Sequence, residues 1–389
     1  MSGFIPYGRQ DVTQADVDAV VEVLRSDFLT QGPRIPAFEQ AWAGRVGAAH
    51  AVAVNSATSA LHIACLALGV GPGDVVWTVP TTFVASANCA LYCGASVDFV
   101  DIDPRTWNMS VAALEAKLVA AEAAGTLPKV VIPVHLCGQP CELEPIGALA
   151  ERYGFYVVED ASHAVGARYQ DRPVGDCRFS DVAVFSFHPV KIITTGEGGL
   201  ATTNDPELAR RMELFRSHGM TRDPERMIGE SHGPWYYQQV ELGYNYRLTD
   251  LHAALGLSQL TRLDEILARR HELAAAYDEA LADLPLRLPW THPDAWSALH
   301  LYPVRLRLDE LDRTRRQVFE AMRAAEIGVN LHYIPVHTQP YYRALGFREG
   351  QFPEAEAYYA EALSLPMFPT LTDAQQRRVV AALREALGV

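Results

Sequence analysis

Apolar and polar residues form two kinds of segment along the first two thirds of the chain. Short, continuous apolar runs are typical of strands buried on both faces of a sheet. We expect strands at 51–54, 75–79, 96–100, 130–134, 156–159, 182–185 and 199–202. Between them, apolar residues at helical spacing predict helices at 59–68, 85–92, 111–123, 143–153 and 206–215. This alternation is typical of an α/β fold with a large, mostly parallel sheet, in which ligands bind at the carboxyl ends of the strands.

The pattern changes near residue 250, where charged residues at helical spacing begin a long helical stretch. We expect a helix over 251–281, a strand over 301–308, and helices over 313–325 and 373–387. The chain therefore divides into a large domain of residues 1–250 and a smaller C-terminal α/β domain of residues 251–389 that includes the long helix. Residues 224–239 are polar and aromatic and predict a loop that covers a site or a subunit interface.

Composition excludes some classes of binding partner and leaves the predicted fold unchanged. The chain has 389 residues, 49% of them hydrophobic, and a formal net charge of −14, which argues against nucleic acid or an anionic membrane as the main partner. Neither a secretory leader nor a membrane-spanning run is present in the pattern, so we expect a cytoplasmic protein. The six cysteines contain no C-x-x-C pair and join no histidine cluster. We expect free, buried thiols and no metal site.

Lys191 is one of only three lysines, whereas the other 30 of the 33 cationic residues are arginine. A lysine in the stretch FSFHPVKIITTGEGG, between a strand end and a Gly-rich turn, therefore indicates a need for an amine. An amine can lose its proton and form a Schiff base with a carbonyl, which a guanidinium cannot do. The alternative is an ordinary exposed loop lysine. Only the residues around Lys191 can distinguish these two interpretations.

Three of the predicted strands end in side chains that can do chemistry. The strand at 156–159 leads into Asp160, and the strand at 182–185 leads into Ser186. The strand at 51–54 is followed by Asn-Ser-Ala-Thr-Ser at 55–59, which opens a helix. Hydroxyls and free N–H groups at a helix start can bind phosphate. The same residues are also good N-caps, so this segment alone does not separate the two interpretations.

An amine, an acid and a phosphate-binding helix start are together what pyridoxal phosphate requires. Lys191 would hold the aldehyde, and Asp160 would keep the pyridine nitrogen protonated so that the ring can take up electrons. Phe83 follows the strand at 75–79 and either stacks on the ring or belongs to the core.

Five blocks resemble, in order, those of the DegT/StrS-type sugar-nucleotide aminotransferases, which are fold-type I enzymes with the aspartate aminotransferase-like fold. The blocks are NSATSALH, TVPTTFVASANCALYCGA, VEDASHAVGA, FSFHPVKIITTGEGG and GYNYRLTDLHAALGLSQL. The resemblance implies pyridoxal 5'-phosphate as cofactor, pyridoxamine 5'-phosphate as intermediate, and Lys191 as the catalytic residue that forms the internal aldimine. Cofactor contacts are implied for Thr58, Ser59, Phe83, Asp160, His163, Ser186, Lys191 and Asn245. Because Asn245 would reach the phosphate of a partner subunit, the resemblance also implies a homodimer with shared sites.

Further stretches resemble the family members that form UDP-4-amino-4,6-dideoxy-N-acetyl-β-L-altrosamine for pseudaminic acid. They are IPYGRQDVTQADVDAVVEVLRSDFLTQGP, the segment from SHGMTRD to GYNYRLTD, and HYIPVHTQPYYRALGF. The expected reaction moves an amino group from L-glutamate to C4 of a UDP-4-keto-6-deoxy-N-acetylhexosamine. Substrate contacts are implied for Tyr7, Asp27, Phe28, Leu29, Thr30, Ala57, Ser186, Asn245, His332, Tyr333 and Ile334.

Three alternatives remain open from the sequence. Another UDP-sugar 4-aminotransferase, of the bacillosamine or 4-amino-arabinose type, would share every cofactor residue. The dehydratase branch of the superfamily lacks the anchoring lysine, so Lys191 argues against it. A non-catalytic relative of the fold would have no need for the complete set of cofactor residues.

Overall fold

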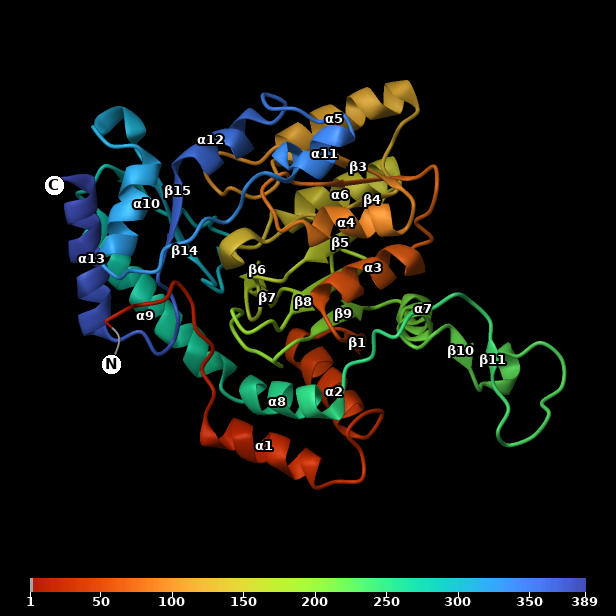
Figure 1. Ribbon diagram of the computed structural model, residues 1–389. Helices are drawn as coiled ribbons and strands as arrows, with labels where there is room; N and C mark the ends of the chain where they lie inside the picture. Colours follow the sequence, from red (N-terminus) through yellow and green to blue (C-terminus); the bar gives the residue numbers. More distant parts are fainter. Residues whose placement is uncertain (1–2) are drawn as a thin grey trace.

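The computed structural model describes residues 3–389, and a seven-stranded sheet runs through its larger part (Figure 1). The strand order is β1-β9-β8-β5-β4-β2-β3, and only β9 runs antiparallel to its neighbours. The expected mostly parallel sheet is therefore confirmed. The strands are β1 (His50–Val54), β2 (Val75–Thr78), β3 (Ser96–Phe99), β4 (Val130–Val131), β5 (Tyr156–Asp160), β8 (Val182–Ser186) and β9 (Gly199–Thr203).

Helices cover both faces of this sheet, which explains its continuous apolar strands. Adjacent residues alternate between two cores: Val130 and Val158 pack in one, and Val131 and Val157 in the other. The first core includes residues of α3 (Ala57–Ala67), α4 (Ala85–Tyr92) and α7 (Pro206–Arg216). The second includes residues of α5 (Val111–Ala124) and α6 (Leu143–Tyr153). Each of the five predicted helices is present within two residues of its expected ends.

The predicted single helix over 251–281 is wrong, because two helices occupy that range. They are α8 (Asp250–Leu260) and α9 (Leu263–Leu281). The chain leaves helical geometry at Arg262, whose φ is −105° and ψ 7°. There its guanidinium pairs with Asp11 at 2.8 Å and with Asp16 at 3.0 Å. The break lets α8 pack against α1 (Gln14–Leu24) and α2 (Arg34–Val46), while α9 continues toward the C-terminal part (Figure 1).

The C-terminal part has its own antiparallel sheet and core. Its strands are β12 (Leu286–Arg287), β14 (Tyr302–Leu306) and β15 (Ala362–Leu365). Residues of α9, α10 (Arg315–Ala324) and α13 (Asp373–Leu387) join this sheet in one apolar cluster. The short helices α11 (Pro340–Ala344) and α12 (Pro353–Glu361) return toward the large sheet, and β6 (Arg168–Tyr169), β7 (Arg172–Pro173) and β13 (Ala295–Trp296) form a small third sheet. The division into domains at residue 250 stays a prediction.

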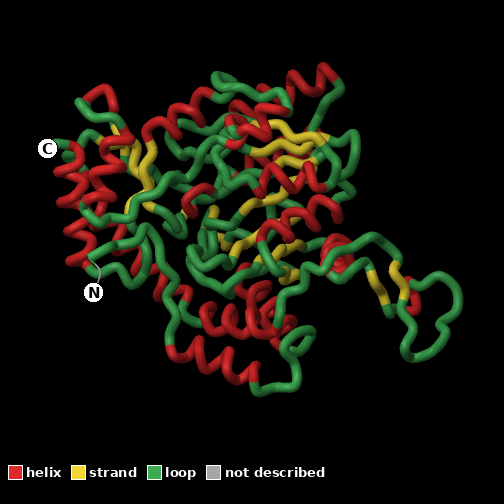
Figure 2. The backbone as a smooth tube through the Cα atoms, in the orientation of Figure 1, coloured by secondary structure: helices red, strands yellow, loops and turns green. Residues whose placement is uncertain are grey.

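A long loop projects from the body beyond α7, as Figures 1 and 2 show. Only one strand pair, β10 (Met220–Thr221) with β11 (Gln238–Gln239), and a single 3-10 turn at Pro224–Arg226 give it regular structure. It presents large apolar side chains to solvent, with Ile228 85%, Trp235 72% and Leu242 77% exposed. Among residues 3–389, no helix is both long and apolar enough to cross a membrane.

Candidate active site

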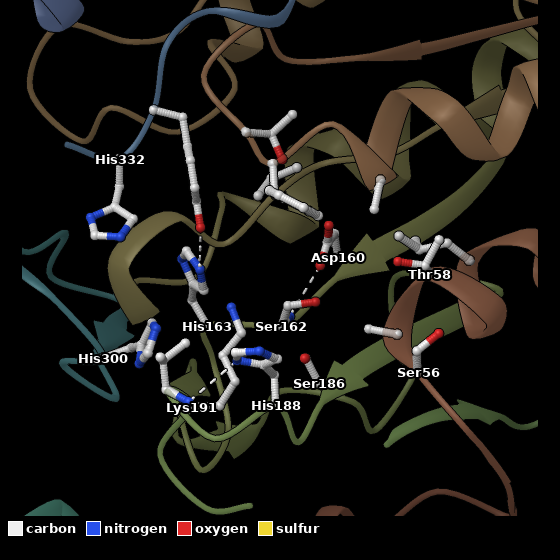
Figure 3. Close-up of a pocket in the computed structure, with 18 of the residues that line it drawn as sticks. Ser56, Thr58, Asp160, Ser162, His163, Ser186, His188, Lys191, His300 and His332 are labelled. Carbon is white, nitrogen blue, oxygen red and sulfur yellow. Dashed lines mark hydrogen bonds between the residues drawn. The ribbon is translucent and has the colours of Figure 1, made fainter. Parts of the chain in front are cut away.

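The carboxyl ends of β5 and β8 meet the start of α3 at a pocket of about 830 Å³ (Figure 3). The parallel strands bring these ends to one edge of the sheet, as expected for a ligand site in an α/β fold. Eleven of the predicted site residues line the pocket: Tyr7, Ala57, Thr58, Ser59, Phe83, Asp160, His163, Ser186, Lys191, His332 and Tyr333.

Lys191 lies in the turn that follows β8. Its backbone N–H donates to the backbone carbonyl of His188 at 2.8 Å. The chain then returns through a Gly-rich turn into β9. Burial lowers the pKa of the Lys191 amine to about 8, although the negative charge of Asp160 opposes the shift. A substantial fraction of this amine is therefore unprotonated slightly above neutral pH. The exposed-lysine interpretation is excluded.

Asp160 ends β5 and is only 5% exposed. Its Oδ1 accepts the N–H of Ser162 at 3.1 Å, and its Oδ2 accepts the hydroxyl of Ser86 at 2.6 Å. In Figure 3, Asp160 lies between the histidines of the pocket and the segment that carries Ser56 and Thr58. This buried carboxylate is thus held by two donors from different elements.

The start of α3 follows β1 directly and is capped by Ser56, whose hydroxyl oxygen accepts the N–H of Ser59 at 3.1 Å. The Ser59 hydroxyl donates to Asn55 Oδ1 at 2.7 Å, so its proton is used within the chain. The N–H groups of Ala57 and Thr58 belong to the first helical turn, which has no intrahelical acceptors for them. The capping interpretation therefore holds for Ser56, and the phosphate-binding role of the first-turn groups stays a prediction.

The tautomer of His163 follows from its two hydrogen bonds. Its Nδ1 accepts the N–H of Cys137 at 3.2 Å, and its Nε2 lies 3.0 Å from the hydroxyl of Tyr333. Burial, together with the charge of Lys191, holds the pKa of His163 well below its usual value. The neutral ring must then carry its proton on Nε2 and donate it to the Tyr333 oxygen. The hydroxyl proton of Tyr333 is left free to donate elsewhere.

Six predicted site residues do not line this pocket. Thr30 pairs with Thr249, and the Leu29 carbonyl accepts the N–H of Asp250 at 3.0 Å. Phe28 and Ile334 are 52% and 45% exposed. Asn245 pairs with Ser217 next to the projecting loop, and its carbonyl lies 3.5 Å from Nδ2 of Asn55 at the pocket wall. The functional roles of Asp27, Phe28, Leu29, Thr30, Asn245 and Ile334 stay predictions.

Several pocket residues were not expected from the sequence. Ser56 and Ser162 each follow a strand end, and the strand-end rule could have included them. His188 lies three residues before Lys191 and was quoted only as part of its motif. No local signal points to His300, Leu331 or Asn330, which come from the C-terminal part of the chain.

The donor set of the pocket fits pyridoxal phosphate. It supplies an amine of lowered pKa, a buried carboxylate on the neighbouring strand, and a helix start with free N–H groups. Gly199 in β9 lies so near this helix start that a Cβ would overlap the backbone of Ser56 and Ala57. The strand and the helix start therefore approach each other more closely than a side chain would permit.

Comparisons with known proteins agree with this chemistry. The sequence model of the DegT/DnrJ/EryC1/StrS aminotransferase family matches residues 10–384. The spore coat polysaccharide biosynthesis protein SpsC of Bacillus subtilis (strain 168) is 40% identical over 385 residues, which cover 98% of this chain and 97% of SpsC.

Two solved structures are similar over nearly the whole chain. Helicobacter pylori PseC, an aminotransferase involved in the biosynthesis of pseudoaminic acid, has 32% identity, a TM-score of 0.90 and 99% coverage of both chains. The putative sugar aminotransferase Spr1654 from Streptococcus pneumoniae, in its PMP form, has 28% identity and a TM-score of 0.89, with 99% of this chain and 98% of Spr1654 covered. Its PLP form is equally similar, with a TM-score of 0.89.

Proposed function

The chain belongs to the DegT/DnrJ/EryC1/StrS aminotransferase family and is a PLP-dependent sugar aminotransferase of fold type I, and from this premise we propose its substrates. The amino group passes from L-glutamate to C4 of a UDP-4-keto-6-deoxy-N-acetylhexosamine. The product is UDP-4-amino-4,6-dideoxy-N-acetyl-β-L-altrosamine, for pseudaminic acid biosynthesis. The observation that carries this proposal is the similarity to Helicobacter pylori PseC over 99% of both chains.

The chemistry of the sugar side of the pocket supports an uncharged keto sugar. Tyr7, His332 and Tyr333 form one wall there, with the Tyr7 and His332 rings 5.5 Å apart. Burial lowers the pKa of His332 to about 3, so this wall is neutral. Among the residues that line the pocket, Lys191 is the only lysine, and no arginine lies with it. The wall thus offers hydroxyl and imidazole hydrogen bonds and no fixed positive charge for an acidic sugar.

We assign the cofactor contacts to residues of this pocket. When bound, pyridoxal phosphate supplies a carbon that exchanges amines and a ring that takes up electrons. Asp160 would hold the pyridine nitrogen, and His163 and Tyr333 would lie by the ring hydroxyl. The first turn of α3, with Thr58, would bind the phosphate together with Ser186. Phe83, 58% exposed at the pocket wall, would cover one face of the ring.

Lys191 would act as both the covalent anchor and the proton carrier. A lysine amine with a pKa of about 8 is unprotonated often enough to accept a proton from the amino donor, and protonated often enough to return one. His163 cannot serve as a second base at Nε2, since that atom already carries a proton that it donates to Tyr333.

We further propose a homodimer in which each pocket is completed by its partner. The pocket of one chain has no arginine among its lining residues for the carboxylates of glutamate. Its open side leaves Phe83 more than half exposed. The loop that exposes Trp235 and Leu242 projects from the body of its own chain (Figure 1), as a segment that reaches a second subunit would do. Asn245 follows this loop and would contact the partner's cofactor phosphate.

A paired assay of the holoenzyme with glutamate tests the substrate proposal. One reaction receives UDP-4-keto-6-deoxy-L-AltNAc and the other UDP-4-keto-6-deoxy-GlcNAc, and release of 2-oxoglutarate is followed in both. We expect a preference for the altro sugar. A preference for the gluco sugar would keep the chemistry but assign a bacillosamine-type product. Turnover of neither sugar would contradict both assignments and direct attention to the sugars of spore coat polysaccharide, for which SpsC is named.

A further inference from the structure

Asp160 receives a hydrogen bond that no strand-end rule predicts. Ser86 lies in the first turn of α4, 74 residues before Asp160 in sequence, and its hydroxyl is 2.6 Å from Oδ2. Both side chains are buried, Ser86 completely and Asp160 to 95%. A hydroxyl this close to a carboxylate makes a charge-assisted bond, which is about twice as strong as a neutral one.

The directions of the neighbouring bonds follow from counting protons. The Ser86 oxygen also lies 2.7 Å from the hydroxyl of Thr82 and 3.3 Å from the carbonyl of Phe83. An ionised Asp160 can only accept, so it takes the single Ser86 proton at the shortest of these distances. Thr82 must then donate to the Ser86 oxygen. The result is a series of hydrogen bonds in which Thr82 donates to Ser86 and Ser86 donates to Asp160.

This series of hydrogen bonds does not cap or stabilise the start of α4 itself. A serine in a first turn ordinarily turns its hydroxyl toward a nearby backbone group. Here the backbone contact to Phe83 is the long one, and the contact to Asp160 is the short one. The N–H of Ser162 binds the other carboxylate oxygen, so the carboxyl plane is fixed from both sides. Each oxygen keeps a further lone pair for a group in the pocket.

We propose that Ser86, supported by Thr82, is a positioning residue that fixes the orientation of the Asp160 carboxylate for the pyridine nitrogen of the cofactor. The inference rests on the proposed role of Asp160. It identifies α4, a helix that supplies no predicted cofactor contact of its own, as part of the cofactor site. Through these hydrogen bonds the start of α4 sets the orientation of the Asp160 carboxylate at the end of β5.

Substitution of Ser86 tests this role through cofactor binding, which needs no sugar substrate. We expect S86A to raise the dissociation constant of pyridoxal phosphate about tenfold or more, because a bond to a buried charge is lost. We also expect a changed visible absorbance spectrum of the bound cofactor. S86T, which retains the hydroxyl, should restore both values to within about threefold of wild type. T82V should have a smaller effect in the same direction.

Thr81 provides a matched control. Its hydroxyl is as buried as that of Ser86 but has no hydrogen-bond partner among residues 3–389, so T81V should leave the cofactor affinity and spectrum unchanged. If S86A does not fold, S86C replaces it in the test, because cysteine fills a similar buried volume and its S–H group is a much weaker hydrogen-bond donor. Wild-type affinity and spectrum in S86A or S86C would overturn the proposal. Failure of both sugars in the paired assay would not affect this result, since the readout is cofactor binding.

Discussion

At the scale of single residues, the surroundings of Lys191 set its chemistry. Four histidines line the same pocket, and burial lowers the pKa of three of them, His163, His300 and His332, so that these three are neutral. Asp160 is the buried acid opposite them. A protonated amine is costly in such a site, because protein replaces most of its water and the negative charge of Asp160 offsets that cost only in part.

The lowered pKa of Lys191 makes a prediction for stability. The unfolded chain keeps this lysine protonated to about pH 10.5, whereas the folded chain releases the proton near pH 8. Between these values the unfolded state binds more protons, so stability of the apo-protein rises with pH. K191M should stabilise the apo-protein by about 1–3 kcal/mol at pH 7, a gain that shrinks from pH 8 to 10.5.

Denaturant unfolding of apo wild type and apo K191M at pH 7, 9 and 10.5 measures this difference. K129M serves as the control, since Lys129 pairs with Asp74 at the surface and its removal should not stabilise the chain. A K191M protein that is less stable than wild type at pH 7 would contradict the burial argument.

Cys93 is the thiol that we expect to react first. The neighbouring thiol of Cys65, together with the nearby His62, lowers the pKa of Cys93 to about 6, and the Cys93 side chain is partly exposed. Cys177 is buried, and burial raises its pKa to about 12. Iodoacetamide at pH 7 should therefore label Cys93 well before Cys177, because the thiolate is the reactive form. Peptide mass spectrometry over time checks the order, and equal labelling of the two residues would refute it.

At the scale of elements, the site depends on a close approach between a strand and a helix. β9 is the one antiparallel strand of the large sheet, and its first residue, Gly199, lies against the N-terminus of α3. A Cβ at this position would overlap backbone atoms of Ser56 and Ala57, which cannot move as a flexible side chain would. The same packing therefore positions both the sheet edge and the first turn of α3, to which we assign the cofactor phosphate.

G199A should lower stability by at least about 2 kcal/mol and weaken the binding of pyridoxal phosphate, since α3 must shift to admit the methyl group. G44A is the matched control: Gly44 lies in the exposed face of α2 with nothing near its Cβ position. There alanine should stabilise the helix by up to about 1 kcal/mol. Thermal unfolding and a cofactor titration of both variants measure these effects. Equal cofactor affinity in G199A and wild type would show that the close approach has no part in the site.

At the scale of the whole molecule, the proposed dimer predicts complementation between two inactive variants. If Asn245 acts in the partner's pocket, a heterodimer of K191M and N245A has one intact pocket, built from Lys191 of one chain and Asn245 of the other. Random exchange of equal amounts should restore about a quarter of wild-type activity, because half of the dimers are mixed and each has one working site.

Activity after unfolding and refolding the two variants together, compared with each refolded alone, measures the exchange. Sedimentation of the mixture confirms that dimers form. If Asn245 served its own pocket, both sites of the heterodimer would be damaged, and no activity would return.

The sequence by itself determined the parts of the protein whose signals are local. Continuous apolar runs predict the seven strands, because a sheet covered on both faces has no polar side. Helical spacing predicts α3 to α7 for a similar reason. The strand-end rule predicts Asp160 and Ser186, and the scarcity of lysine predicts Lys191. These signals fail where tertiary packing, rather than the periodicity of the sequence, determines where an element begins or ends. The helical pattern continues through Arg262, yet its ion pairs with Asp11 and Asp16 end one helix and start the next.

Only the tertiary structure decided which distant residues meet. Ser86 contacts Asp160 across 74 positions, and Tyr333 contacts His163 across 170, and neither pair has a local signal. The pKa of Lys191 likewise depends on burial by several elements at once. Sequence can name the amine and the acid because their chemistry demands those residue types. The hydroxyls that orient them could come from many positions, and folding alone selects which ones they are.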